Sequence, residues 1–278
     1  APPETAPTFP SKPIDVRFRP SKPRQHDIAV IIGNANYKKQ GKDIPNVTPA
    51  YADAEGMKRY VKQALGVSED NIIFLKDATQ KDMTSTFGTG TNHKGRLFRY
   101  LVPGKSRVFV YYAGHGAPGE ADSNYLVPTD AEASLIDLNG YPIKTLYKNL
   151  SKLPAKSVTL VLEACFSGAS QGGSLVTRSS GITVVPKAST VPSNITVISA
   201  GTASQIASWE EDKSHSLFTK YFLKGMSGEA DRPPTGNGDG VVGYDELGAY
   251  LKETLTYFAR RYYGRDQTAR IVVGRPGS

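Results

Sequence analysis

Apolar residues in this chain gather in short unbroken runs that are separated by longer stretches of mixed polarity. Six of these runs have the length of a strand and are rich in β-branched and aromatic residues. They are DIAVIIG, NIIFLKD, RVFVYYAG, SVTLVLEA, NITVISA and ARIVVG, which begin at residues 27, 71, 107, 157, 194 and 269. A run that is apolar along its whole length is typical of a strand covered on both faces. The pattern therefore predicts six buried strands.

Helical stretches lie between most of these runs. We predict helices at 49–66, 92–102, 143–153, 215–226 and 244–263. Strands that alternate with helices favour an α/β fold, with a mostly parallel six-stranded sheet and helices on both faces.

Two segments lack this regular pattern. Residues 1–26 are rich in proline, which predicts an extended or disordered arm. Residues 168–194 are rich in Ser, Gly and Thr and predict one long mobile loop. The remainder, 27–278, is expected to form a single domain that contains this loop.

Composition narrows the classes of function. The net charge is +8 and the pI is about 9.3, but the Lys and Arg residues are scattered, so we do not expect nucleic-acid binding. The apolar runs are far shorter than the roughly 20 residues of a membrane span. The sequence begins at Ala1 rather than Met, as after removal of a signal peptide or trimming of the chain, and we favour an exported protein.

The candidate catalytic residues come directly after the third and fourth predicted strands. YYAGHG places His115 after one strand, and EACFSG places Cys165, the only cysteine of the chain, after the next. The carboxyl ends of parallel strands meet at one edge of a sheet, so the imidazole and the thiol are expected to converge there. A thiolate attacks while an imidazole moves protons, which is the arrangement of a cysteine nucleophile. The alternative is a buried structural cysteine.

YYAGHG, EACFSG and their separation of 50 residues resemble the caspase-type cysteine peptidases, above all the bacterial caspase homologues and metacaspases. The resemblance implies the caspase–hemoglobinase fold and a Cys-His dyad acting on proteins or peptides. In it, His115 protonates the leaving amine and Cys165 is the nucleophile. The backbone amides of Gly116 and Cys165 form the oxyanion hole. We expect a monomer.

The resemblance also suggests a specificity pocket. Aspartate-cleaving caspases carry Ser-Trp-Arg where this chain has Ser-Trp-Glu, which makes Trp209 a substrate-binding residue and places Glu210 at the arginine position. Glu163 stands where caspases have glutamine and metacaspases aspartate, and Asp53 in AYADAEGM matches an aspartate of metacaspases. Acidic groups in such a pocket favour cleavage after Arg or Lys. Alternatively, Asp53 caps or salt-bridges the first helix and Glu210 is solvated.

Two other functions stay open: the same dyad with specificity for Asp or another residue, and a non-catalytic interaction module on a caspase fold. The loop at 168–194 carries Arg178 and Lys187. An enzyme that prefers basic residues would meet these two tethered near its own active site at high effective concentration. Self-cleavage after either residue is therefore predicted as an alternative to a merely solvated loop.

No cofactor is expected to be required, although calcium remains an alternative. TGNGDGVVGYDE, residues 235–246, matches an EF-hand loop in part but begins with Thr235 instead of Asp, and we interpret it as a turn before a helix at Tyr244. Near the expected catalytic loops, the acidic residues that could bind calcium are only Glu120 and Asp122. The remaining histidines lack the spacing of zinc ligands with the cysteine and are interpreted as surface or helix-start residues. They are His26, His93 and His215.

Overall fold

The structure is a computed structural model. It describes residues 7–40, 43–120, 123–166, 169–171, 173–175, 194–201 and 205–274. Most of the predicted loop at 168–194, including Arg178 and Lys187, therefore lies outside the described residues, as does Asp122.

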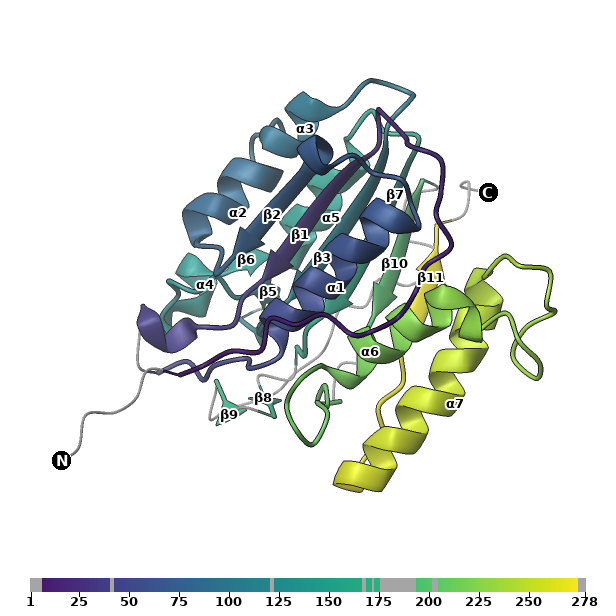
Figure 1. Ribbon diagram of the computed structural model, residues 1–278. Helices are drawn as coiled ribbons and strands as arrows, with labels where there is room; N and C mark the ends of the chain where they lie inside the picture. Colours follow the sequence, from purple (N-terminus) through teal and green to yellow (C-terminus); the bar gives the residue numbers. More distant parts are fainter. Residues whose placement is uncertain are drawn as a thin grey trace.

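The centre of the fold is the predicted six-stranded sheet (Figure 1). All six predicted runs form strands, and their order across the sheet is β11-β10-β7-β3-β1-β2. Five strands are parallel, and β11 at the edge is antiparallel to β10. The strands are β1 (Ile28–Gly33), β2 (Ile72–Lys76), β3 (Arg107–Ala113), β7 (Ser157–Glu163), β10 (Ile195–Ser199) and β11 (Arg270–Val273).

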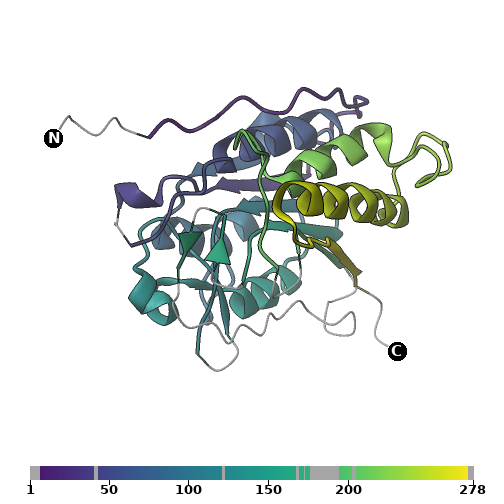
Figure 2. The same cartoon turned by 90° about the horizontal axis from the view of Figure 1, so that it is seen from below.

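Helices cover both faces of this sheet, as predicted, and Figure 2 shows the two layers edge-on. One layer holds α1 (Ala50–Gln63), α6 (Leu217–Lys224) and α7 (Tyr244–Tyr263). The other holds α2 (Gln80–Phe87), α3 (Arg96–Tyr100) and α5 (Ile143–Ser151). Alternate side chains of each strand enter opposite layers: in β1, Ala29 and Ile31 join the first core, and Val30 and Ile32 the second. A strand buried on both sides must be apolar at every position, which explains the unbroken runs.

Smaller elements were not predicted. After β3, the chain forms a second, antiparallel sheet, and a short hairpin follows the cysteine. These elements are β4 (Gly116–Pro118), β5 (Asn124–Leu126), β6 (Tyr141–Pro142), β8 (Ala169–Ser170), β9 (Gly173–Ser174) and α4 (Ile136–Asn139), with 3-10 turns at Tyr37–Lys39, Glu69–Asn71 and Ala133–Leu135 and a π turn at Gly225–Glu229.

Besides the short α4, the helix predictions differ from the structure at α2 and α3. α2 was missed, although Thr79 and Asp82 form a capping box at its start, which is a readable signal. The helix predicted at 92–102 is confined to α3, because Gly95 is its N-cap and Pro103 disfavours helical backbone just before it.

The described part of the N-terminal segment, residues 7–26, runs along α1 without regular secondary structure (Figure 1). The side chain of Phe18 is buried in the core of the first layer. The guanidinium group of Arg59 donates hydrogen bonds to the carbonyls of Ile14 and Val16. These contacts hold the extended segment against the helix.

Candidate active site

Two neighbouring parallel strands bring the histidine and the cysteine together. Ala113 at the end of β3 pairs with Glu163 at the end of β7, so the two strands end at the same level. His115 and Cys165 each lie two residues beyond that pair, and both line one pocket at the carboxyl edge of the sheet. The structure thus places the two predicted residues in a single site, as the strand order required.

The hydrogen bond of the imidazole fixes its tautomer. Nε2 of His115 lies 2.7 Å from the carbonyl oxygen of Pro45. A carbonyl only accepts, so Nε2 carries the hydrogen and Nδ1 is the nitrogen left to accept a proton. Burial lowers the pKa of His115 to about 4, against the opposing effect of the Pro45 carbonyl, so the ring is neutral at neutral pH.

Tyr37 holds the same histidine from behind. Its hydroxyl accepts the backbone N–H of His115 at 2.9 Å and donates to the carbonyl of Val127 at 3.0 Å. The centroids of the tyrosine and imidazole rings are 4.8 Å apart. The position of His115 is therefore fixed both at its backbone and at its ring.

The thiol is buried at the base of the pocket. Cys165 is 8% exposed, and its sulfur accepts the backbone N–H of Ala207. Burial raises the pKa of the thiol to about 12; the Ala207 N–H and the Arg265 charge lower it, and the Glu163 charge raises it. In this conformation the cysteine and the histidine form a neutral pair.

Gly116 approaches the backbone of the cysteine more closely than any other residue type could. A Cβ atom at this position would lie 2.7 Å from the carbonyl oxygen of Cys165 and 2.7 Å from the ring of Phe166. Such contacts are too short for a side chain, so only glycine lets the start of β4 lie against the nucleophile segment.

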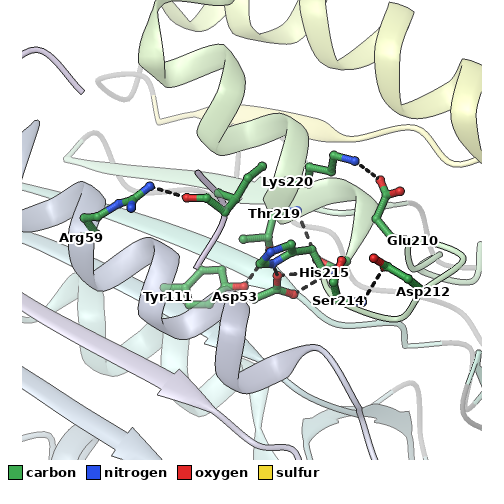
Figure 3. Close-up of polar contacts among 11 residues, drawn as sticks. Asp53, Arg59, Tyr111, Glu210, Asp212, Ser214, His215, Thr219 and Lys220 are labelled. Atoms are coloured by element: carbon green, nitrogen blue, oxygen red, sulfur yellow. Dashed lines mark hydrogen bonds and ion pairs between the residues drawn. The ribbon is translucent and has the colours of Figure 1, made fainter. Parts of the chain in front are cut away.

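Asp53 lines the pocket from α1. It is 1% exposed, and its two oxygens lie 3.3 and 3.1 Å from the backbone nitrogen of Ser216, which donates to them. Nδ1 of His215 lies 3.2 Å from Oδ1 (Figure 3). Burial raises the pKa of Asp53, and the contacts with His215 and Ser216 lower it. This carboxyl group ties α1 to the segment that begins α6.

Glu163 lines the same pocket from the end of β7, and it is 5% exposed. Within the described part of the chain, its Oε2 atom has no hydrogen-bond partner. Burial and the nearby Asp53 carboxyl raise the pKa of Glu163 well above its ordinary value, although Ser216 lowers it. A buried carboxylate oxygen without a donor is costly, so the raised pKa favours the protonated form of Glu163 in the unliganded pocket.

The two other predicted pocket residues separate. Trp209 is 4% exposed and lines the pocket. Glu210 is not among the described residues that line it; its carboxylate lies 2.7 Å from Nζ of Lys220 in α6 (Figure 3). The structure therefore pairs Glu210 with a lysine instead of leaving it solvated or adding it to the pocket.

Several partners of the site could not be read from the sequence. His215 precedes the N-cap of α6, as a helix-start residue does, but its contact with Asp53 spans 162 positions. The carbonyl of Pro45 and the hydroxyl of Tyr37 reach His115 across 70 and 78 positions. Local patterns carry no information on contacts of this kind.

The loop at 235–246 forms a turn that leads into α7 at Tyr244. The carboxylate of Glu246 accepts the backbone N–H groups of Asn237 and Gly243, both at 2.9 Å, and that of Asp239 accepts the N–H of Val241 at 2.8 Å. An EF-hand loop would use the same carboxylate oxygens for calcium, and here they accept the hydrogen bonds of the turn. Across the described residues, no three His, Cys, Asp or Glu side chains are grouped as metal ligands.

The sheet is mostly parallel and lies between two helical layers, and His115 and Cys165 follow the ends of adjacent strands. These features place the protein among the α/β proteins that have a cysteine-histidine site. A sequence profile described as the caspase domain matches residues 26–236, and the chain belongs to this family. Membership of this family indicates a cysteine peptidase, which acts on proteins or peptides. No helix among the described residues is long and apolar enough to cross a membrane.

A solved structure supports the same fold. The chain is similar to caspase-1 from Spodoptera frugiperda, with a TM-score of 0.58 and 13% sequence identity over 96% of this chain and 94% of that one. At this identity the likeness concerns the fold alone. Comparison with curated proteins found no match.

Proposed function

We propose that the protein is a cysteine endopeptidase that cleaves after Arg or Lys, with Cys165 as the nucleophile and His115 as the acid/base. One observation carries the specificity: in the pocket that holds both groups, Oε2 of Glu163 lies buried and no described residue donates a hydrogen bond to it. Asp53 in the same pocket adds a second carboxyl group. A substrate cation would supply the missing donor.

The proposed reaction uses the tautomer that the Pro45 contact selects. Nδ1 of His115 takes the thiol proton as the sulfur of Cys165 attacks the scissile carbonyl carbon. The oxyanion is stabilised by the N–H groups of Gly116 and Cys165. The imidazolium then protonates the leaving amine, and water hydrolyses the thioester and restores the thiol. Because burial favours the neutral thiol, the proton leaves as the carbon–sulfur bond forms.

Charge sets the preference for basic residues. Burial raises the pKa of Asp53, and burial together with the nearby Asp53 carboxyl raises that of Glu163, so the pocket disfavours two negative charges. A bound guanidinium or ammonium group relieves that repulsion, whereas an aspartate side chain would add a third carboxylate. The planar guanidinium can also pair with two acceptors at once.

The test is a panel of fluorogenic peptides ending in Arg, Lys or Asp, assayed with wild type, Cys165→Ala and His115→Ala, each with calcium chloride and with a chelator. We expect wild type to cleave the Arg and Lys peptides, and both variants to be inactive while keeping the wild-type circular dichroism spectrum. Faster cleavage of the Asp peptide would overturn the specificity. A folded wild type that cleaves none of them in either condition would favour the interaction module.

A further inference from the structure

Arg265 joins the hairpin that follows Cys165 to the segment at residues 207–209, which lines the active-site pocket. It follows Gly264, whose left-handed conformation (φ 61°) ends α7 and turns the chain back. Its Nε donates to the hydroxyl of Ser208 and its Nη2 to the side-chain oxygen of Gln171, both at 3.2 Å. The same oxygen of Gln171 accepts the backbone N–H of Trp209 at 2.9 Å.

These contacts connect the segment that follows the nucleophile with the segment that contacts its sulfur. Gln171 lies between β8 and β9, six positions after Cys165. Ser208 is next to Ala207, whose backbone N–H donates to the sulfur. Ser208 is also fixed through its own N–H, which donates to the side chain of Gln267 at 2.8 Å. A single guanidinium group thus bridges both sides of the thiol.

The charge of Arg265 has no acidic counterpart in the described part of the chain, because no carboxylate there lies within ion-pair distance of it. Its guanidinium lies over the ring of Tyr263, 4.9 Å from the centroid. Burial lowers the pKa of the Arg265 guanidinium, and the charges of Cys165 and Tyr263 raise it. Arg260, five positions earlier, is instead paired with Asp266.

We propose that Arg265 is a positioning residue for the proposed cysteine peptidase reaction, which orders the two segments beside Cys165 and supplies a positive field that favours its thiolate. The first role belongs to the forked hydrogen bonds and the second to the charge. The catalytic part of this inference rests on the proposed function, but the reactivity of the Cys165 thiol can be measured without any substrate.

Two variants separate the roles. Arg265→Gln removes the charge and the fork, and Arg265→Lys keeps the charge but loses the fork. Arg261→Gln is the matched control, because Arg261 is an exposed residue of α7 whose side chain donates a hydrogen bond to the hydroxyl of the exposed Tyr257. Circular dichroism and thermal unfolding show whether each variant is folded.

The readout is the rate at which iodoacetamide alkylates the protein between pH 6 and 9, followed by intact mass. Each molecule contains one cysteine, so a single adduct reports Cys165. We expect alkylation to slow about tenfold in Arg265→Gln, as for a rise of about one unit in the thiol pKa. Arg265→Lys and Arg261→Gln should stay within about twofold of wild type, and only the two Arg265 variants should raise KM for an Arg peptide.

The electrostatic and the purely structural roles predict opposite changes in the alkylation rate. A purely structural clamp would expose the thiol when removed, so alkylation in Arg265→Gln would be unchanged or faster, and either result overturns the electrostatic role. Equal slowing in Arg265→Lys would also overturn it, because the charge is retained there. If wild type cleaves no peptide, the proposed function fails while the alkylation rates still decide the effect of Arg265 on the thiol.

Discussion

Replacing Glu163 by Gln separates the function of the pocket from its stability. The substitution keeps the shape of the side chain and removes the ability of this buried group to ionise; its Oε2 lacks a donor within the described residues. A hydrogen bond to a charged group contributes about 1.5 to 3 kcal/mol. Loss of that bond to a substrate guanidinium should therefore lower kcat/KM for an Arg peptide roughly 10- to 100-fold, since each 1.4 kcal/mol is a factor of ten.

The same variant should not lose stability, and the pH dependence gives the sign. Because the pKa of Glu163 in the folded protein is raised above 4.5, the folded state holds the proton more tightly than the unfolded chain. Its contribution to stability is complete below about pH 4.5 and is lost as the pH rises towards the raised pKa. Gln cannot ionise, so Glu163→Gln should match the Tm of wild type at pH 4 and exceed it at pH 8.

Asp53→Asn is the matched comparison, because Asp53 also lines the pocket but both its oxygens accept hydrogen bonds from Ser216. We expect Asp53→Asn to lower the Tm as well as the activity. Peptide kinetics at pH 7.5 and thermal unfolding at pH 4 and 8 provide the measurements. An unchanged Arg-to-Asp selectivity in Glu163→Gln, or a Tm that drops together with activity, would refute the assignment of Glu163 to substrate binding.

Three further outcomes are expected. Glu210→Gln should change kcat/KM for an Arg peptide less than threefold, because this carboxylate is paired with a lysine outside the pocket, so a 10-fold loss in peptide kinetics would contradict the geometry. Intact-mass measurement should show wild type divided after Arg178 or Lys187 and Cys165→Ala whole at 30.0 kDa; a fully active but uncut wild type would exclude processing. Burial lowers the pKa of His115 from 6.5 to about 4, so the unfolded chain binds this proton at a higher pH than the folded protein. The free energy of unfolding should therefore fall by up to about 3 kcal/mol as the pH drops from 6.5 to 4. In urea unfolding, a His115→Asn variant should lose less stability over this pH range than wild type.

The sheet was predictable because each of its strands carries its own local signal. The runs at β1 and β3 are apolar at nearly every position, which only a strand buried on both faces requires. The placement of His115 and Cys165 in one pocket followed from the general rule that ligands bind at the carboxyl edge of parallel strands.

The pocket wall was not predictable in the same way. Whether a carboxylate faces the pocket or a neighbouring lysine depends on the path of the segment before α6. No local sequence pattern distinguishes Glu163 from Glu210 in this respect. Among the described residues, the Oε2 atom of Glu163 has no hydrogen-bond partner, whereas Glu210 forms an ion pair with Lys220. The contacts of Arg265 arise from the turn after α7, where Gly264 reverses the chain. Such contacts are products of tertiary packing, which leaves no periodic trace in the sequence.

The central claim, a nucleophilic Cys165 beside an acidic specificity pocket, is tested most directly by labelling with an arginyl chloromethyl ketone and, in parallel, with its aspartyl counterpart. Peptide mapping by mass spectrometry locates the adduct. We predict one adduct on Cys165 with the arginyl reagent, slower labelling in Glu163→Gln, and no labelling in a folded His115→Ala variant. Faster labelling by the aspartyl reagent, or no adduct on Cys165 in wild type, would contradict the account.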